Sequence, residues 1–195
     1  MLLWRKCEAV DRDAFEDWTN GEFMSGQQYE GWDNMMSYEK RDTQQIDDVL
    51  DKAVLKKGVV VTRLAGSSLA LGHGSRLKDD GSSLKRLQKQ KGKIVLQKGC
   101  MSTGAAAEGL TIGQSGKNCE YHIHIPPSKG AGMWIGDSRI NGWDRRQREF
   151  ITNRDSYFRL GDASWDAGRK KYVIDVYWEG RDQHDYGTTG RLTNY

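Results

Sequence analysis

Apolar residues follow two different spacings in two parts of the chain. Within residues 8–55 they stand apart among acidic and polar residues, and Ile46, Val49, Leu50 and Val54 fall at positions i, i+3, i+4 and i+8. This spacing predicts an amphipathic helix, and the turn at Thr19-Asn20-Gly21 separates an earlier helix from the next one. From Gly58 onward, short apolar runs replace the helical spacing. The chain is therefore expected to be an α+β protein, with helices first and strands afterwards.

Seven short runs rich in β-branched and aromatic residues predict strands. They span residues 58–63, 93–97, 119–125, 131–135, 147–152, 155–160 and 171–178. A short helix is expected over 83–90, and the stretch 104–117, rich in Gly and Ala, predicts a mobile loop. The polar segment 180–195 predicts a poorly ordered tail. No repeat or linker divides the chain, so we expect one domain over 1–195, with a helical part (1–57), a β core (58–180) and a polar tail (181–195).

Composition restricts the classes of protein to which the chain can belong. Of 195 residues, 36% are hydrophobic and 29% are charged, which is typical of a soluble domain with a modest core. Mean hydropathy is −0.79, and no apolar run approaches the roughly 20 residues of a membrane helix. No basic leader precedes an apolar stretch, so a signal peptide is not predicted. We therefore expect no membrane partner, and a place of action in the cytoplasm of the producing or the target cell.

The charge of the chain is unevenly spread. The net charge is only +3, which is too weak to indicate nucleic-acid binding by itself. Basic residues nevertheless gather in 84–98, without an acid, and again in 139–148. Two interpretations stay open for these stretches: solvated surfaces, or attraction for NAD phosphates or another anionic target.

Cysteine and histidine positions do not predict a metal site. Cys7, Cys100 and Cys119 have no metal-binding spacing, and their sparse, odd number fits a reducing compartment. Cys100 and Cys119 are expected to be small buried side chains. His122 and His124 share one strand face, but no third ligand stands near them in sequence, so we expect no zinc.

Three polar fragments near separate predicted strands suggest a site for cleaving a glycosidic bond. Arg63 ends the run 59–63, Ser102 and Thr103 follow the run 93–96, and Glu149 lies two residues after Gln147 on one strand face. Loss of nicotinamide from NAD creates positive charge on the ribose, which a carboxylate such as Glu149 stabilises. A guanidinium suits phosphate or ribose oxygens, and a hydroxyl can orient the carboxylate.

The stretch from Gly58 to Gly180 resembles the mono-ADP-ribosyltransferase exoenzymes of the Arg–Ser–Glu type, which include clostridial binary-toxin components and Rho-modifying exoenzymes. Three motifs carry the resemblance: Val59-Val60-Val61-Thr62-Arg63, Cys100-Met101-Ser102-Thr103-Gly104, and Gln147-Arg148-Glu149-Phe150-Ile151. The resemblance implies N-terminal helices on a mostly antiparallel, two-sheet β core. It also implies NAD as co-substrate, no metal, and a bacterial or phage effector acting as a toxin.

The resemblance assigns roles to individual positions. Its implied catalytic residues are Arg63, Ser102, Gln147 and Glu149. Arg63, Ser102 and Glu149 are also expected to bind NAD, together with Leu64, Thr103 and Lys117. Loop 136–146 would recognise the acceptor, through Trp143, Arg145 and Arg146 together with Gln147.

The sequence departs from the family pattern at three positions. Gly104 replaces the third residue of the Ser-Thr-Ser motif, Leu64 stands where many members have Gly or Arg, and Lys117 lies near where some carry another NAD-binding arginine.

The first residue of the Gln147-Arg148-Glu149 motif bears on the acceptor. Arginine-modifying members usually have Glu-x-Glu, whereas Gln-x-Glu is similar to members that modify asparagine or guanine. An amide both donates and accepts hydrogen bonds, which suits an amide or a base edge. We therefore expect transfer of ADP-ribose to a non-arginine acceptor, in protein or nucleic acid. A monomer is expected, with an antitoxin or immunity protein as a further partner.

Two other functions remain as alternatives. An NAD glycohydrolase on the same fold would use water as the acceptor. A non-catalytic nucleic-acid-binding module would use the basic stretches 84–98 and 139–148, and its affinity would fall steeply with salt.

Overall fold

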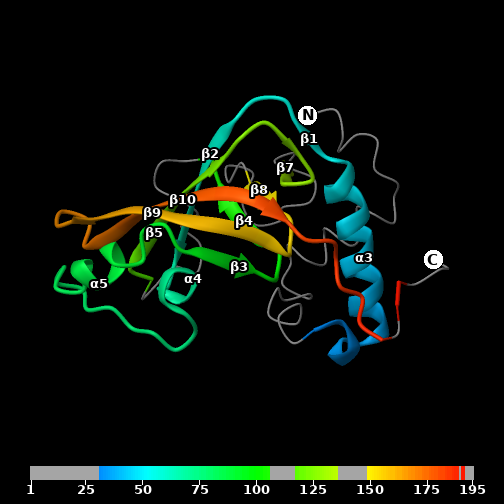
Figure 1. Cartoon of the computed structure of the whole chain (residues 1–195), viewed down its shortest axis with the longest axis horizontal. Helices are drawn as coiled ribbons and strands as arrows, with labels where there is room; N and C mark the ends of the chain where they lie inside the picture. Colours follow the sequence, from blue (N-terminus) through cyan, green and yellow to red (C-terminus); the bar gives the residue numbers. More distant parts are fainter. Residues whose placement is uncertain (1–30, 106–116, 136–148, 189, 192–195) are drawn as a thin grey trace.

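The computed structural model describes residues 31–105, 117–135, 149–188 and 190–191 (Figure 1). Its helices are η2 (Trp32–Asn34), α3 (Ser37–Lys52), α4 (Ser68–Leu71) and α5 (Leu84–Gln88). Its strands are β1 (Val54–Leu55), β2 (Val59–Ala65), β3 (Ile94–Gln97), β4 (Met101–Gly104), β5 (Cys119–Ile125), β6 (Ser128–Lys129), β7 (Gly132–Trp134), β8 (Glu149–Thr152), β9 (Ser156–Asp166) and β10 (Lys171–Arg181). Within these ranges, none of the helices is both long enough and apolar enough to cross a membrane.

Eight strands form one sheet in the order β3-β9-β10-β5-β2-β4-β8-β7, and β1 pairs with β6 in a separate ribbon. The pair β10–β5 is parallel and the other described pairs are antiparallel. Strands β2 and β4 meet at one residue pair, Thr62 opposite Gly104. The sheet thus has a five-stranded and a three-stranded part joined at this pair. The predicted α+β class and mostly antiparallel core are confirmed, while the strands expected in two sheets form these two parts of one continuous sheet.

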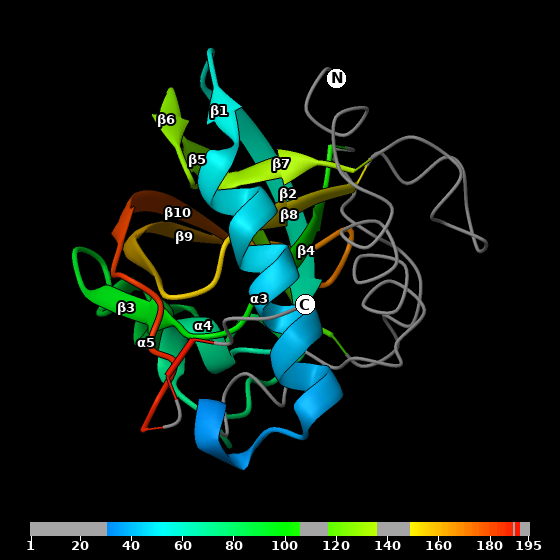
Figure 2. The ribbon, with the colours of Figure 1, turned by 90° about the vertical axis from the view of Figure 1, so that its right-hand side faces the viewer.

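Two apolar clusters hold the helices on the sheet. The larger one packs α4 and α5 against the five-stranded part and includes Leu87, Tyr121 and Phe158. The smaller one joins α3 to the three-stranded part, where α3 lies across β7 and β8 (Figure 2). It contains Ile46 and Leu50 of the predicted amphipathic helix, which confirms the buried face of that helix.

Residue 54 does not belong to this helical face. Helix α3 ends at Lys52, and Val54 lies in β1 with 54% of its surface exposed. Ala53, which has an extended backbone as the helix C-cap, is buried in its place.

The alternating strand pattern located most of the sheet. Strand β5 has the predicted bounds, while β9 and β10 continue beyond theirs to Asp166 and Arg181. The predicted helix 83–90 is present as α5. Cys100 and Cys119 are buried free thiols, as expected. Most of the predicted loop 104–117, the first half of the helical region 8–55, and Cys7 lie outside the described residues.

One expected connection is wrong. The sequence suggested that Ser102 lies at the edge of the apolar strand 93–97, but that strand is β3, at the far end of the sheet. Ser102 belongs to the separate strand β4, between β2 and β8. Four residues without an apolar run give no periodic signal, and the pairing of β4 with two distant strands makes it a strand.

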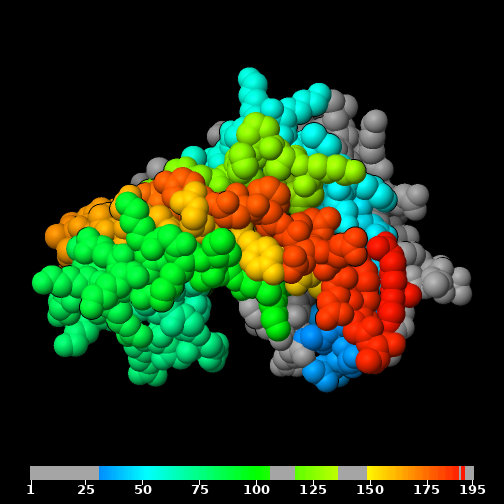
Figure 3. Space-filling model, viewed as in Figure 1, coloured from blue at the N-terminus to red at the C-terminus, as the bar shows by residue number. Residues whose placement is uncertain are grey.

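The start of the polar tail is packed, contrary to the expectation for 180–195. Figure 3 shows the C-terminal segment, in red, beside the first described residues, in blue. The ring of Tyr186 meets Trp32 edge-on at 4.8 Å, and its hydroxyl donates to Asp47 at 3.0 Å. The backbone N–H of Thr188 donates to Asp33 at 3.0 Å. These contacts bind residues 182–188 to η2 and α3.

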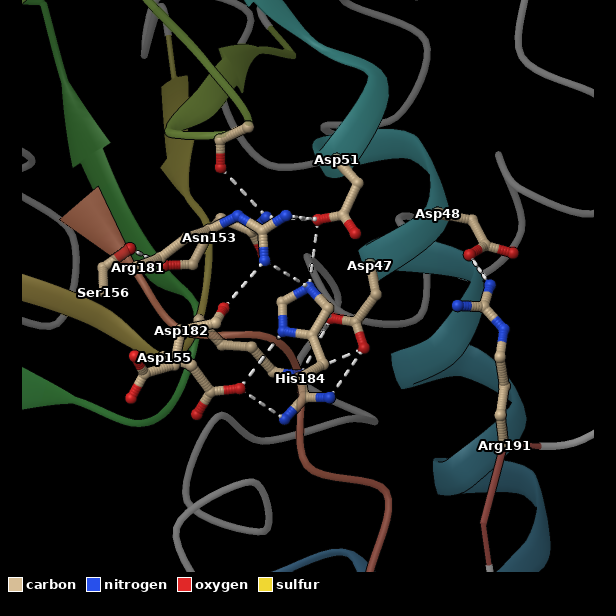
Figure 4. Close-up of polar contacts among 12 residues, drawn as sticks. Asp47, Asp48, Asp51, Asn153, Asp155, Ser156, Arg181, Asp182, His184 and Arg191 are labelled. Carbon is tan, nitrogen blue, oxygen red and sulfur yellow. Dashed lines mark hydrogen bonds and ion pairs between the residues drawn. The ribbon is translucent and has the colours of Figure 1, made fainter.

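A buried histidine lies at the centre of this attachment (Figure 4). The side chain of His184 is 3% exposed, and its two ring nitrogens lie 3.1 Å from Asp155 Oδ2 and 3.0 Å from Asp51 Oδ1. Its Nε2 is also 3.5 Å from Asp47 Oδ1, while Arg154 opposes its charge. Burial alone would lower the pKa of His184. The hydrogen bonds to Asp155 and Asp51 and the charge of Asp47 outweigh burial, so its pKa is raised.

We expect the attachment of the tail to weaken as pH rises. Because the pKa of His184 is raised in the folded state, its stabilisation is complete below about pH 6.5, the unfolded value, and is lost as pH passes the folded pKa. Urea unfolding between about pH 5.5 and 9 should show wild type losing free energy of unfolding relative to His184→Gln. A difference that stays constant over this range would contradict a charged His184.

Candidate active site

Three neighbouring strands bring together Arg63, Ser102 and Glu149. Arg63 lies on β2, Ser102 on β4 and Glu149 on β8, which are adjacent in the sheet. Glu149 pairs with Gly104, and Gly104 in turn pairs with Thr62, the neighbour of Arg63. Ser102 and Gly104 are two residues apart on one strand, so Ser102 and Glu149 project from the same face. Arg63 and Ser102, 39 positions apart in the chain, and Ser102 and Glu149, 47 positions apart, therefore come into contact.

Direct hydrogen bonds link the three residues. Ser102 Oγ donates to Glu149 Oε1, and Arg63 Nη1 donates to the carbonyl oxygen of Ser102 at 2.5 Å. The Glu149 residue is 5% exposed, whereas Arg63 and Ser102 are half-buried. The hydroxyl thus fixes the orientation of a largely desolvated carboxylate, and the guanidinium is held beside it. Such an arrangement suits stabilisation of a cationic sugar, because electrostatic interactions are stronger away from water.

Two residues that neighbour the cluster in sequence, Thr103 and Leu64, are buried. Thr103 is fully buried and donates its hydroxyl to the carbonyl oxygen of Phe150 at 2.7 Å, which links β4 to β8. Leu64 is also buried, on the face of β2 opposite to Arg63. Thr103 and Leu64, which were predicted to bind NAD, thus have their side chains in the interior. Contact of either residue with NAD remains a prediction.

Lys117 lies close enough to Arg63 for their charges to interact. Partial burial lowers the pKa of Lys117, and the charge of Arg63 lowers it further. Lys171 Nζ donates to the carbonyl oxygen of Lys117 and so positions this part of the chain before β5. Two cations held near each other are a suitable site for a pyrophosphate. A role of Lys117 in binding the phosphates of NAD remains a prediction.

Two supporting residues were not predicted from the sequence. Tyr121 lies opposite Arg63 on β5, is fully buried, and donates its hydroxyl to the carbonyl oxygen of Gly66 at 2.9 Å. Thr62 Oγ1 donates to the carbonyl oxygen of Gly104 at 3.3 Å, at the junction of the two sheet parts. Tyr121 lies in an alternating apolar run, which predicts only a buried strand position. Its hydroxyl group was the one feature in the sequence that indicated a polar role.

The four predicted acceptor-recognition residues, Trp143, Arg145, Arg146 and Gln147, lie outside the described residues. His122 and His124, which the sequence did not predict to bind zinc, are among the described residues, and each contacts a carboxylate. His122 Nε2 is 2.7 Å from Glu120, and His124 Nε2 is 2.9 Å from Asp175. In the described ranges, no group of three or more His, Cys, Asp or Glu side chains is arranged so that it could hold a metal ion.

A cavity of about 440 Å³ lies away from the Arg63–Ser102–Glu149 cluster. It is lined by the first residues of β2 and by His124, Arg159 and Tyr177, among others. His124 stacks on Tyr177 with ring centroids 4.7 Å apart, and Arg159 lies 4.6 Å from the centre of the Tyr177 ring. None of the three residues of the cluster lines it. We therefore assign it no part in the chemistry.

Replacing Ser102 by alanine is expected to lower the rate of nicotinamide release about ten- to a hundredfold. The change removes one hydrogen bond to a charged group, worth about 1.5–3 kcal/mol, and leaves the carboxylate in place. Steady-state kinetics should show the loss mainly in kcat, since the hydroxyl orients Glu149. A fall confined to KM would assign Ser102 to binding alone.

The sequence profile of the ADP-ribosyltransferase exoenzyme family matches residues 25–178. No curated protein sequence matches the chain. Among solved structures, the C3 exoenzyme of Clostridium limosum has a TM-score of 0.72, 16% identity, and coverage of 89% of this chain and 87% of that one. C3stau2 from S. aureus with NAD has a TM-score of 0.71, 16% identity, and coverage of 89% and 88%.

A further similar structure is Plx2a, an ADP-ribosyltransferase toxin from Paenibacillus larvae. Its TM-score is 0.74 at 16% identity, with 90% of this chain and 89% of that one covered. These likenesses show a shared fold over most of both chains, and the profile match shows the family. The chain belongs to the ADP-ribosyltransferase exoenzyme family and is an NAD-dependent mono-ADP-ribosyltransferase.

Proposed function

We propose that this chain transfers ADP-ribose from NAD to an amide or nucleobase acceptor, with Glu149 as the catalytic carboxylate. The observation that supports it most is the hydrogen bond from Ser102 Oγ to Glu149 Oε1, on strands adjacent to the one that carries Arg63. The carboxyl group is buried and held in one orientation by Ser102, which suits stabilisation of a sugar cation. The structure of C3stau2, which shares this fold, is a structure with NAD.

In the proposed reaction, Arg63 and Lys117 bind the phosphates of NAD, and Glu149 lies beside the nicotinamide ribose. The bond between the ribose and nicotinamide breaks, and its electron pair leaves with nicotinamide. Positive charge on the ribose is stabilised by Glu149, which Ser102 holds in place. A nucleophilic atom of the acceptor then bonds to the ribose carbon and loses a proton. Arg63 and Lys117 thus bind and orient NAD, while Glu149 stabilises the transition state.

The acceptor class follows from Gln147 and its spacing to Glu149. A guanidinium acceptor benefits from a second carboxylate, while an amide or base edge pairs with the donor and acceptor atoms of glutamine. Gln147 is therefore proposed to present a non-arginine acceptor to the ribose. Trp143, Arg145 and Arg146 are proposed to contact the same macromolecule.

The acceptor is tested with NAD labelled in its adenine and with fractionated cell extract. We expect label on protein or nucleic acid, and no transfer to agmatine, a small arginine analogue. Gln147→Glu should gain activity toward agmatine while it keeps nicotinamide release. Efficient labelling of agmatine by the wild type would contradict the proposed acceptor class.

Water as the acceptor is distinguished in the same assay. A glycohydrolase would release nicotinamide without labelling any fraction, whereas a transferase couples the two in the presence of its target. Nicotinamide release without label in every fraction would therefore favour the glycohydrolase.

A further inference from the structure

Helix α5 and strand β3 carry a basic surface that lies outside the Arg63–Ser102–Glu149 cluster. The chain has no acidic residue between Asp80 and Glu108. Six cations of this stretch are exposed: Lys85, Arg86, Lys89, Lys91, Lys93 and Lys98. In Figure 3 the residues of α5 and β3, in green, form a continuous part of the near face.

Strand β3 is the edge of the eight-stranded sheet. One side pairs with β9, from Ile94 opposite Arg159 to Gln97 opposite Ser156. In the described ranges, no strand pairs with its other side. An edge strand directs the N–H and C=O groups of every second residue away from the sheet, where they are available to another strand.

Two aliphatic side chains stand exposed on one face of this edge. Ile94 is 61% and Leu96 41% exposed, whereas Val95 between them packs against the larger apolar cluster. Leu87 of α5 belongs to the same cluster, so α5 lies on the face of Val95. The edge therefore has an apolar face with Ile94 and Leu96, and an opposite face near the cations of α5.

Few acids neutralise the cations of this surface. Lys91 pairs with the exposed Asp162 at 2.6 Å, and Arg86 donates to the carbonyl oxygen of Arg76 and to Ser75 Oγ. Two copies of the edge would bring like charges together, which opposes self-pairing. The same charges attract an acidic strand.

We propose that the β3 edge binds an extended segment of a partner polypeptide in which apolar residues alternate with Asp or Glu. The segment adds a strand beside β3, with backbone hydrogen bonds that continue the sheet. Its apolar side chains pack beside Ile94 and Leu96. Its carboxylates project to the other face, toward Lys93 and the cations of α5.

The alternation distinguishes this partner from other anions. A nucleic acid or an anionic membrane would use the charge of the surface but not the unpaired backbone of β3. An acidic strand uses the charge, the backbone and the two aliphatic side chains together.

The probe is a fluorescent ten-residue peptide of alternating Val and Glu, measured by anisotropy with the full chain. We expect saturable binding, and loss of binding when alternate amides of the peptide are N-methylated, since those amides pair with the edge. Hydrogen exchange should show slower exchange of the backbone amides of 94–97 in the complex.

Two double variants and one control test the side chains. Lys89→Glu with Lys93→Glu should weaken binding roughly tenfold at low salt. Ile94→Ser with Leu96→Ser should also weaken it, at all salt concentrations. Lys56→Glu, also at an exposed lysine but in the turn before β2, should bind as wild type does. All variants should retain NAD cleavage, which shows that they are folded.

Three outcomes would overturn the proposal. The first is no saturable binding of the peptide by the wild type, and the second is equal binding of the N-methylated peptide. The third is tighter binding of single-stranded RNA or of vesicles with phosphatidylserine than of the peptide. None of these outcomes bears on Glu149, so the proposed transferase chemistry would stand.

Discussion

Glu149→Gln is expected to abolish nearly all release of nicotinamide and all transfer of ADP-ribose. The amide keeps the shape of the side chain and can still accept the hydrogen bond from Ser102, but it carries no negative charge. A cationic transition state thus loses its electrostatic stabilisation, for which we expect a rate loss of at least about a hundred- to a thousandfold. Single-turnover kinetics with labelled NAD measures this loss directly.

Folding of this variant must be measured beside its activity. Glu149 is only 5% exposed, so its charge is already costly to bury, and the neutral amide should leave the free energy of unfolding within about 1 kcal/mol of wild type. Glu179→Gln is the matched control, because Glu179 is exposed and pairs with Arg159 at 2.7 Å. The control should keep full activity. Wild-type release of nicotinamide by Glu149→Gln would show that another group does the chemistry.

Whether a strand can be predicted from the sequence depends on whether local or distant contacts stabilise it. The run Cys119–Ile125 buries every second residue against the larger cluster, so its pattern alone gives its bounds. Strand β4 has four residues and is defined by pairing with β2 and β8, contacts that local pattern does not contain. The segment after Arg181 is polar, and it is ordered by ion pairs and rings from α3 and η2 that lie more than 130 residues away in the chain.

The candidate active site could be predicted only in part, for a related reason. Spacing indicates which face of a strand a residue occupies, but not which strands become neighbours. The choice of Arg63, Ser102 and Glu149 depended on the family resemblance, and the sheet order brings them together. A motif also does not tell which of its residues share a face: the adjacent Ser102 and Thr103 point to opposite faces of β4.

Removal of the Arg154 guanidinium is expected to cost more stability than the other substitutions considered. Arg154 Nε and Nη2 donate to the carboxylate of Asp47 at 2.8–3.1 Å, and Nη1 pairs with Asp155 at 2.9 Å. The side chains of Arg154 and Asp47 are 5% and 0% exposed. Arg154→Met leaves the Asp47 charge buried, with Tyr186 and His184 as its remaining partners among the described contacts, which should cost about 3–5 kcal/mol.

That loss is large compared with the 5–15 kcal/mol by which a domain is typically stable. The Arg154–Asp47 pair is therefore expected to be a main attachment of α3 to the sheet. Arg154 follows β8 and Asp47 lies on α3, so the pair joins the helix to the strand that carries Glu149. Urea unfolding of Arg154→Met measures the cost, with Arg159→Met, at a partly exposed arginine, as the control, expected within about 1 kcal/mol of wild type. Asp47→Leu with Arg154→Met removes both charges and should be more stable than Arg154→Met alone, because no unpaired charge remains buried. If the double variant is instead the less stable, the cost arises from lost packing and the hydrogen bond to Tyr186, and charge pairing does not hold α3 on the sheet.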